Sequence, residues 1–364
     1  MNKSLSHLHQ LLLDKGIAFV CYSLPGISKA ITLISYHPIS FLDLSYLADN
    51  KEDGFVFAPF EINEKSPIWF LKTDKIIDEK TDILAIEKDL EALSDVNQKS
   101  NLDLDSTSKS IYSQTFEVFL KELKLKKLDK VILSRIVTEP RSGEELFEIY
   151  ERMSASYESA FTYWIQLPTG EIWMGATPEL LLKQNESGLK TMALAGTQVL
   201  NNRNVGDVIW ENKEIEEQAY VRNYVQKVLS VFSDSVEASE TFTTQAGNLA
   251  HLRTNFTVNQ SFEQSKIIEL VKRLHPTPAV CGIPLEASKK LILKEENHNR
   301  SYYTGFLGLI KKEAISLFVN LRCMQVLPEK FALYVGGGIT RDSEMEKEWK
   351  ETEAKAQTLL SVIG

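Results

Sequence analysis

Two predicted helices each carry two acidic residues at a spacing of three positions. The pairs are Glu214 with Glu217, and Glu348 with Glu351. Residues at i and i+3 lie on one face of a helix, so each pair directs two carboxylates to the same side. If the two faces meet, their oxygens form a site suited to Mg²⁺, which prefers carboxylates and keeps several of its waters. The spacing therefore leads to the hypothesis of a magnesium site.

A structural interpretation of the same acids remains open. Glu351 and Lys355 are four residues apart, as in the ion pairs of solvated helices, and Glu217 fits an ordinary first-turn acid favoured by the helix dipole. The glycines at 336–338 favour a site, because residues without a side chain let a backbone approach a ligand closely. The six histidines are scattered, and none has the spacing of zinc ligands, so a zinc site is not expected.

Glu179 and Lys130 are candidates for acid–base chemistry. Glu179 interrupts the apolar segment "GATPELLLK", and a carboxyl in apolar surroundings has a raised pKa, so it can stay protonated and act as an acid. Lys130 opens "KVILSR", where a lysine beside a buried core can be pushed toward neutrality and serve as a base. Either side chain can equally lie at an edge and extend its charged end to water.

Arg322 lies within "FVNLRCMQV", which the pattern predicts to be one apolar strand. A buried cation requires an anionic partner. Together with Lys355, Arg322 could hold the two carboxylates of a dianionic ligand.

The predicted elements explain how these residues would be positioned. A helix is expected at about 211–232, with an apolar stripe formed by Val221, Tyr224, Val225, Val228 and Phe232. The C-terminal helix has its own stripe, formed by Trp349, Thr352, Ala356, Leu360 and Ile363. Glu217 lies one turn before the first stripe, Glu214 lies a turn earlier, and both are expected to point inward. Glu348, Glu351 and Lys355 form a wall beside the second stripe.

The remaining chain is rich in strand signals. Apolar runs bounded by turn residues predict strands in "GIAFVCYSL", "AITLISY", "FVFAPF", "PIWFLK" and "KVILSRIVTEP", and a helix is expected from Ile111 to Leu128. Short Pro, Asn and Gly turns join "FTYWIQL" to "EIWMGA" and "ELLLKQ" to "LKTMALAG", which implies antiparallel hairpins. The polar stretch 94–110 has little to bury and is expected to be an exposed connection.

Composition excludes several classes of function. The 364 residues are 43% hydrophobic and 25% charged, as in globular proteins, and the net charge is −9. This charge opposes general binding to nucleic acid or anionic membranes, which rests on basic surface. Cys21, Cys281 and Cys323 are far apart and odd in number, which favours buried thiols in a reducing cytoplasm. Neither a signal peptide in "MNKSLSHLHQLLL" nor a transmembrane run is expected.

Eight blocks in a fixed order give the chain a family resemblance. From about Lys130 to Lys355 they read "KVILSR", "GATPELLLK", "ALAGTQ", "HLRTNF", "LHPTPAVCGIP", "YYTGFLG", "LRCMQV" and "GGGITRDSEMEKEWKETEAK". In these blocks the chain resembles the chorismate-utilising enzymes, and among them most closely the isochorismate synthases. The first 110 residues match only in general character.

The resemblance implies an α+β fold in which two packed antiparallel β-sheets are flanked by helices. The whole chain, 1–364, would form a single chorismate-binding domain. Within it, 1–110 would be a divergent N-terminal part, 94–110 an exposed loop inside the domain, and 111–364 the family core.

The resemblance also implies roles for the residues singled out above. Lys130 matches the general base that takes a proton from water attacking C2 of chorismate, and Glu179 matches the general acid that protonates the departing C4 hydroxyl. Glu217 and Glu351 match ligands of a Mg²⁺ cofactor, with Glu214 and Glu348 beside them holding the waters of the ion. The implied reaction is a reversible isomerisation.

Substrate binding is implied for a further group of residues. Arg322 and Lys355 match the groups that bind the substrate carboxylates, and the remaining positions line the pocket: Gly196, Thr197, His251, Ala279, Tyr303 and Gly336. The expected partner is the small molecule chorismate, with no nucleic acid, no membrane and no obligate protein partner.

Three differences between this sequence and those of related enzymes bear on which product is formed. Relatives often show "KDR" followed by "EH", whereas this chain has Ile215 and Gln218 at the arginine and histidine positions. Amine-adding relatives have a nucleophilic lysine where this chain has Ala195, which disfavours that branch. The block "LHPTPAVCGIP" is typical of isochorismate synthases and predicts little elimination of pyruvate. A salicylate synthase, another chorismate-utilising enzyme or a catalytically silent binding protein remain alternatives, and both menaquinone and siderophore synthesis remain open as pathways.

Overall fold

The first of two sheets, sheet 1, joins the N-terminal strands to the C-terminal ones. The computed structural model describes residues 3–27, 29–78, 81–95, 102–200 and 203–364, and within these ranges nine strands form sheet 1, with all neighbours antiparallel. Their order across the sheet is β15 (Gly282–Ile283), β7 (Lys130–Pro140), β19 (Lys330–Ile339), β18 (Cys323–Val326), β9 (Ile172–Thr177), β8 (Phe161–Gln166), β1 (Ala18–Ser23), β2 (Ile31–Ser35) and β6 (Lys75–Ile77).

Sheet 2 is also antiparallel throughout and has ten strands among the described residues. Its order is β12 (Glu237–Ala238), β14 (Leu249–Val258), β11 (Gly188–Val199), β10 (Leu180–Asn185), β17 (Ala314–Val319), β16 (Phe306–Lys311), β4 (Gly54–Ala58), β5 (Ile68–Lys72) and β3 (Ile39–Phe41), with β13 (Phe242–Ala246) pairing with β14. The two hairpins predicted from turn residues are β8–β9 and β10–β11, so both are confirmed.

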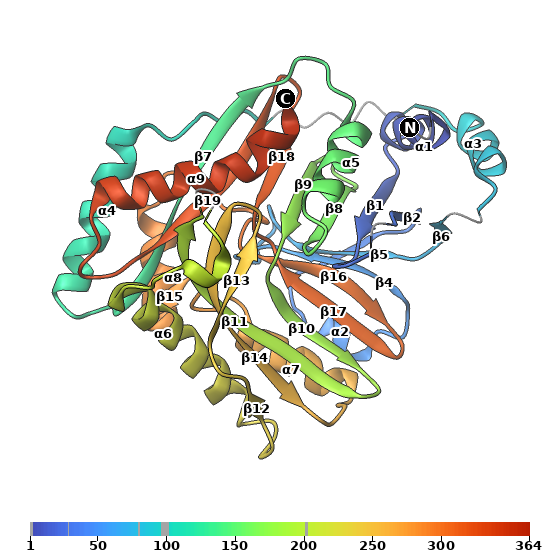
Figure 1. Cartoon of the computed structure of the whole chain (residues 1–364). Helices are drawn as coiled ribbons and strands as arrows, with labels where there is room; N and C mark the ends of the chain where they lie inside the picture. The colour runs from blue at the N-terminus through green and yellow to red at the C-terminus, as the bar shows by residue number, and fades with distance from the viewer. Residues whose placement is uncertain (1–2, 28, 79–80, 96–101, 201–202) are drawn as a thin grey trace.

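Helices cover the outer faces of both sheets (Figure 1). Against sheet 1 pack α1 (Lys3–Asp14), α3 (Ile83–Glu91), α5 (Leu146–Ser156) and α9 (Met345–Ile363). Against sheet 2 pack α2 (Tyr46–Asp49), α6 (Asn212–Leu229) and α7 (Gln264–Leu274), while α4 (Lys109–Lys124) and α8 (Leu285–Glu295) lie at the β7 end of sheet 1. A short 3₁₀ turn, η1 (Val205–Asp207), precedes α6.

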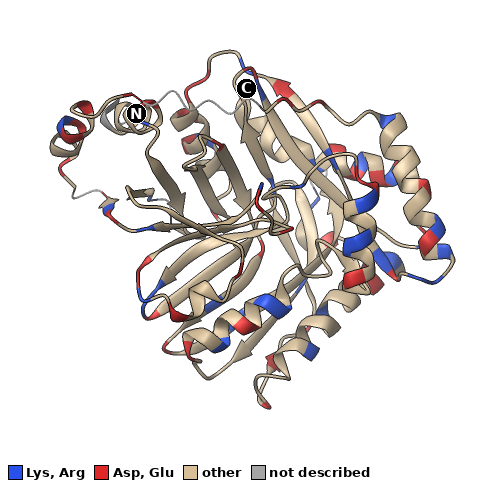
Figure 2. Ribbon diagram, turned by 180° about the vertical axis from the view of Figure 1, so that it is seen from behind, with Lys and Arg blue, Asp and Glu red and all other residues tan. Residues whose placement is uncertain are grey.

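The alternation of side chains along each strand creates the layers. In β4, Phe55 and Phe57 belong to the core between the sheets, whereas Val56 and Ala58 belong to the core beneath α6 and α7. Figure 2 shows charged residues gathered on helices and connecting loops, with the strands largely free of them. The expected α+β fold of two packed antiparallel sheets flanked by helices is therefore confirmed.

The sequence missed or misplaced some elements. Helices α1 and α3 were not predicted. Helix α4 begins two residues before the predicted Ile111, because Ser108 caps it by accepting a hydrogen bond from the Ile111 amide, and it ends at Lys124 instead of Leu128.

The polar stretch 94–110 is only partly the exposed connection that was predicted. Residues 96–101 lie outside the described ranges, and 109–110 belong to α4. Thr107 is buried and exchanges hydrogen bonds with the backbone of Ile136 in β7, so this part of the stretch is attached to sheet 1.

The buried face of α9 is rotated slightly from the predicted stripe. Thr352, Ala356 and Ile363 are buried as expected, but Leu359 and Val362 complete the apolar face, and Trp349 and Leu360 are half-buried. The rotation brings Glu348 into the interior, with 1% of its surface exposed.

Two connections between the sheets lie side by side and place two of the predicted site residues. Strand β9 of sheet 1 leads to β10 of sheet 2 through Pro178 and Glu179. Strand β17 of sheet 2 leads back to β18 of sheet 1 through a segment that contains Arg322. The prediction that Arg322 lies inside one apolar strand is therefore wrong, because "FVNLRCMQV" is divided between two strands of different sheets.

Two expectations about thiols and membranes can be compared with the structure. The three cysteines are free and buried, as predicted. Within the described residues, none of the helices combines the length and apolar character needed to span a membrane.

Candidate active site

A pocket lies where the two sheet-to-sheet connections meet the ends of β7, β11 and β19. It contains about 670 Å³ of space outside protein atoms, its mouth included, which is within the range of sites for small ligands, ~300–1,000 Å³. Ten of the fourteen predicted site residues line it: Glu179, Gly196, Thr197, Glu217, His251, Ala279, Tyr303, Arg322, Gly336 and Lys355. The structure thus brings together residues that are up to 176 positions apart.

Glu179 is the buried acid of this pocket, with 3% of its surface exposed. Burial raises the pKa of Glu179 to about 8, although the positive charges of Lys130, Arg322 and Lys355 act in the opposite direction. The carboxyl is therefore largely protonated at neutral pH and can donate a proton, which is the first of the two interpretations that its apolar sequence allowed.

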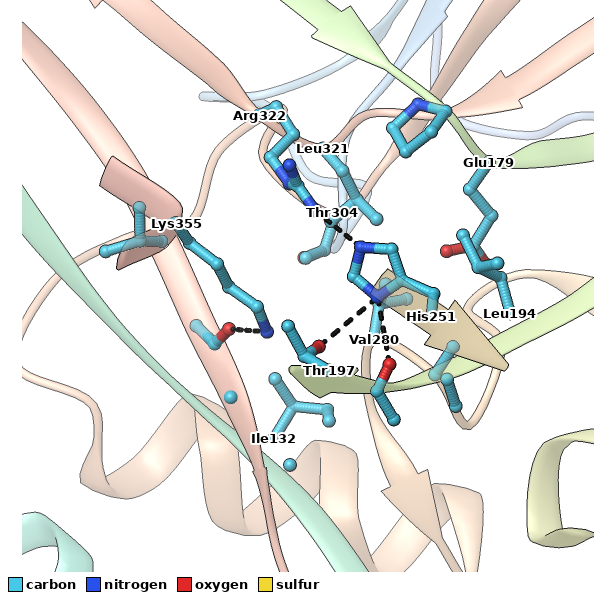
Figure 3. A pocket seen from close by; sticks show the side chains of 18 of the residues that line it. Ile132, Glu179, Leu194, Thr197, His251, Val280, Thr304, Leu321, Arg322 and Lys355 are labelled. Carbon is cyan, nitrogen blue, oxygen red and sulfur yellow. Dashed lines mark hydrogen bonds between the residues drawn. The ribbon is translucent and has the colours of Figure 1, made fainter. Parts of the chain in front are cut away.

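Arg322 and His251 form a hydrogen-bonded pair on the pocket wall (Figure 3). Arg322 Nη2 donates to His251 Nε2 at 2.9 Å, and His251 Nδ1 lies 2.9 Å from the carbonyl oxygen of Gly196. Because a guanidinium only donates and a carbonyl only accepts, His251 must carry its proton on Nδ1 and be neutral. Burial, followed by the charge of Arg322, lowers the pKa of His251 to about 3, which agrees with this assignment.

The guanidinium of Arg322 has neutral acceptors and no carboxylate among its described hydrogen-bond partners. Its Nη1 donates to Thr358 Oγ1 at 3.2 Å, and burial lowers the pKa of Arg322 to about 10. Arg322 has a φ of 49°, in the left-handed region that non-glycine residues rarely adopt. A strained, buried cation held by neutral partners is a suitable receptor for an anion.

Gly196 reaches the pocket through an irregularity in β11. The pairing of β11 with β14 shifts between Ala195 and Gln198, and Gly196 has a φ of 73°. A Cβ at this position would lie 3.2 Å from the Cβ of Glu214, so glycine allows β11 and α6 to approach closely.

Lys355 lies between the pocket and the acidic residues. Its Nζ donates to the carbonyl oxygen of Gly336 at 2.8 Å and to Glu351 Oε1 at 2.7 Å. A Cβ on Gly336 would lie 2.9 Å from the hydroxyl of Tyr303. The glycines were predicted to let the backbone approach a ligand closely. In the structure, Gly336 lets the backbone pack closely against a side chain of the site.

Three predicted metal-side acids converge on the same glycine segment. A Cβ on Gly337 would lie 3.4 Å from Glu351 Oε1 and 3.6 Å from Glu348 Oε2, and one on Gly338 would lie 2.4 Å from Glu217 Oε1. Acids of α6 and α9 therefore meet at the end of β19, which is the condition that the magnesium hypothesis requires.

Glu214 is placed differently from the other three acids. Its carboxylate accepts a hydrogen bond from the Glu211 amide at the start of α6, forming a capping box. The residue is half-buried, and its carboxylate is engaged by the helix terminus. Its predicted part in a metal site remains a prediction.

Lys130 is fully buried and does not line the pocket. Its Nζ lies 2.9 Å from Glu217 Oε1, in an ion pair whose angle is not that of a hydrogen bond. Glu217 itself lines the pocket, so this residue lies between Lys130 and the pocket. Burial alone would raise the pKa of Glu217, but Lys130 and other lysines hold it below its ordinary value.

The donor chemistry of the acidic cluster fits a divalent cation. Glu348 Oε2 is buried without a hydrogen-bond partner. Burial, and then the charge of Glu351, raise the pKa of Glu348 to about 7. A cation between these carboxylates would satisfy the oxygen and offset the repulsion, and an all-oxygen donor set suits Mg²⁺. As placed, with carboxylates directed to lysines, no described His, Cys, Asp or Glu residues form a ready group of three metal ligands.

Several residues that build the site were not predicted. Lys213 of α6 contacts Glu348 Oε1 at 2.5 Å. Its sequence signal was the segment "KEIEEQ", where a lysine directly precedes the acidic pair. Thr358, which holds Arg322, had no signal, because a threonine on a helix face has many structural roles.

A buried ion pair, Arg300 with Glu296, fixes one pocket wall. Arg300 donates to both carboxylate oxygens of Glu296 at 2.6 and 2.7 Å, and to the carbonyls of Val280 and Ile132 at 2.8 and 2.9 Å. Val280 and Ile132 line the pocket. Ser134 donates to the same carboxylate through its amide and hydroxyl. One arginine therefore ties β7 to the segment that carries Ala279.

The departures from the family pattern can now be located. Ile215 is half exposed and is not among the pocket residues. Gln218 is buried and donates to Thr254 Oγ1 at 2.9 Å, which joins α6 to β14. Ala195 lines the pocket with a methyl group only, so no amine is available at this position.

Comparisons with known proteins identify the family to which the chain belongs. The family model for chorismate binding enzymes matches residues 43–364, a range that begins well before residue 111. The chain is 28% identical over 248 residues to isochorismate synthase EntC of Escherichia coli K12, and 29% identical over 252 residues to isochorismate synthase DhbC of Bacillus subtilis 168. Each match covers 65% of this chain and 63% of the relative, so the chain spans just under two thirds of these proteins.

The fold is similar to that of a solved relative. The menaquinone-specific isochorismate synthase MenF of Escherichia coli superposes with a TM-score of 0.77 at 20% sequence identity, covering 98% of this chain and 91% of that one. At this identity the likeness concerns the fold.

Proposed function

Because the chain belongs to the chorismate-binding enzyme family, we propose that it is a Mg²⁺-dependent isochorismate synthase, an isomerase that converts chorismate to isochorismate. The names of its relatives EntC and DhbC support this activity. The observation that carries the proposal is one pocket that contains a protonated acid, Glu179, together with two cations, Arg322 and Lys355.

The two cations suit the two carboxylates of chorismate. Arg322 is held by His251 and Thr358, which leaves its charge available to an anion. Lys355 enters the pocket from α9, the helix that also carries Thr358. Charge-assisted hydrogen bonds from both would fix the orientation of the ring, and orientation contributes strongly to rate.

The reaction exchanges one hydroxyl for another. The oxygen of a water molecule forms a bond to C2, the ring double bond shifts, and the bond between C4 and its hydroxyl breaks. Lys130 rests as an ammonium beside Glu217. Once it has released its proton to solvent, the neutral amine can accept the proton lost by the attacking water, while Glu179 donates a proton to the hydroxyl that departs as water. Transfer of a proton between the two residues through solvent restores the starting state.

Burial of Glu179 serves the acid step directly. Its pKa of about 8 keeps the proton in place at neutral pH, whereas an exposed carboxyl would already have lost it. When bound, Mg²⁺ would offset the negative charge of the substrate next to Glu217 and Glu351, with Glu348 and Glu214 nearby.

The pocket supports water over an amine as the nucleophile. Ala195 offers no amino group at the position where amine-adding relatives carry a lysine. Ala279 and Val280 form an apolar wall from the "LHPTPAVCGIP" block, and we expect little elimination of pyruvate. The free, buried cysteines support a reducing compartment, the cytoplasm, as the location.

A product assay tests the proposal. Purified protein is incubated with chorismate and Mg²⁺, and the mixture is resolved by chromatography. We expect isochorismate to accumulate until it is in equilibrium with chorismate. An unchanged chorismate peak across a range of pH and Mg²⁺ concentration would instead favour a silent binding protein on the same fold.

A further inference from the structure

Each acid that converges on the glycine segment is already paired with a lysine. Glu217 pairs with Lys130 at 2.9 Å, Glu348 with Lys213 at 2.5 Å, and Glu351 with Lys355 at 2.7 Å. The described cluster of three carboxylates is thus matched by three ammonium groups, and its negative charge is largely offset. A cation approaching this cluster meets much less attraction than three free carboxylates would provide.

The three lysines differ in what else they face. Lys130 is fully buried and Lys213 does not line the pocket, whereas Lys355 lines it and is hydrogen-bonded to Gly336 at its edge. Lys355 is therefore the lysine that can contact a ligand in the pocket while it also contacts a metal-side acid.

We propose that Lys355 exchanges partners on ligand binding, so that a dicarboxylate in the pocket takes Lys355 from Glu351 and thereby frees Glu351 for a divalent cation. This inference rests on the proposed function, and it predicts that dicarboxylate and cation bind cooperatively. Lys213 does not line the pocket and stays paired with Glu348, so it affects only how strongly the cluster attracts a cation.

The charges agree with such an exchange. A dianion brings two negative charges to Arg322 and Lys355, and a divalent cation returns two positive charges to the acids that Lys355 has left. The charge of either ligand is less well balanced when that ligand binds alone. The dianion then meets a lysine that is still paired with Glu351, and the cation meets carboxylates that are still paired with lysines. Coupling between two ligands is reciprocal, so each must tighten the binding of the other by the same factor.

Calorimetric titration of the full-length protein tests the inference without turnover. Mg²⁺ is titrated in the absence and presence of saturating 3-(1-carboxyvinyloxy)benzoate, a stable aromatic dicarboxylate with the ring carboxylate and enolpyruvyl ether of chorismate. We expect the dicarboxylate to lower the Kd for Mg²⁺ about tenfold, within the usual range of ~5–150-fold for coupled sites. Benzoate, with one carboxylate, should give a smaller change.

Two substitutions with the same change of charge separate the roles of the lysines. Lys355→Gln leaves Glu351 free from the start, so Mg²⁺ should bind more tightly to the free protein and the effect of the dicarboxylate should fall below about threefold, a loss of most of the coupling. Lys213→Gln should also tighten Mg²⁺ binding but leave the tenfold coupling unchanged. Lys347→Gln, which removes an exposed lysine paired with Glu344, is the control and should change neither.

The outcomes distinguish this inference from the proposed function. Equal Mg²⁺ affinity with and without the dicarboxylate, or full coupling in Lys355→Gln, would overturn the exchange while isochorismate formation stands. If Lys355→Gln misfolds or fails to bind the dicarboxylate, Lys355→Arg provides the test, because it retains a cation and should retain the coupling; loss of coupling there would also overturn the inference. Absence of Mg²⁺ binding under all conditions, with full activity after chelation, would contradict the magnesium-dependent function itself.

Discussion

Glu179 should make the protein less stable while making it active. The carboxyl is buried in the pocket and has a pKa of about 8, whereas the same group in the unfolded chain titrates near its ordinary value of 4.5. Glu179→Gln keeps the shape of the side chain and removes the titration. We therefore expect the variant to lose at least ~10²-fold in turnover, the usual scale for a general acid, and to gain stability at neutral pH.

The pH dependence of this gain follows from proton linkage. Below pH 4.5 Glu179 is protonated in both the folded and the unfolded state, so its ionisation does not change the free energy of unfolding. Between pH 4.5 and 8 the unfolded chain releases the proton and the folded protein keeps it, so the stability of the wild type falls as pH rises. At ~1.4 kcal/mol per pH unit, the loss reaches about 3 kcal/mol at pH 7 and about 5 kcal/mol above pH 8.

Urea unfolding at a series of pH values measures this difference. The free energy of unfolding of Glu179→Gln minus that of the wild type should be smallest near pH 4.5 and should grow to about 3 kcal/mol at pH 7. Glu186→Gln, at the exposed β10–β11 turn, is the matched control and should show little pH dependence. A difference that stays constant from pH 4.5 to 8 would refute the reasoning, because it would mean that Glu179 ionises at an ordinary pKa.

Four further results are expected. Lys130→Ala should lower turnover at least ~10²-fold with an unchanged circular dichroism spectrum, and near wild-type turnover would exclude its role as base. Chelation by EDTA should abolish activity and Mg²⁺ should restore it, with Glu351→Gln requiring more Mg²⁺; full activity after thorough chelation would remove the metal from the proposal. Arg300→Ala should cost about 3–5 kcal/mol in urea unfolding, because it leaves the buried carboxylate of Glu296 unpaired, and a loss under 1 kcal/mol would contradict that role for the pair. A coupled lactate dehydrogenase assay should detect little pyruvate, whereas pyruvate released in step with chorismate loss, with salicylate fluorescence, would indicate a salicylate synthase.

Local sequence patterns predicted the elements that carry the site. The two hairpins followed from Pro, Asn and Gly turns, and both were found. The spacing of Glu348, Glu351 and Lys355 placed them on one wall of α9, where they lie. For Glu179 the apolar sequence around it allowed either a buried acid or an edge residue that reaches water, and its burial and raised pKa select the buried acid.

Features that depend on tertiary contacts could not be predicted in this way. Arg322 was placed in a single strand because the apolar run around it is continuous, and only the pairing of the sheets shows that the chain changes sheet there. The capping-box contact of Glu214 competes with any other use of its carboxylate, and helical periodicity does not distinguish the two. The pairing of each acid with a lysine from another element requires the relative positions of α6, α9 and β7.

The most direct test of the central claim follows an oxygen atom. Isochorismate is formed from chorismate by the purified protein in water enriched in oxygen-18, separated by chromatography and analysed by mass spectrometry with fragmentation. If water attacks C2 while Glu179 protonates the departing C4 hydroxyl, each product molecule carries one heavy oxygen, located at C2. Isochorismate without the label, or with the label elsewhere, would contradict this mechanism, and the absence of isochorismate would contradict the proposed function.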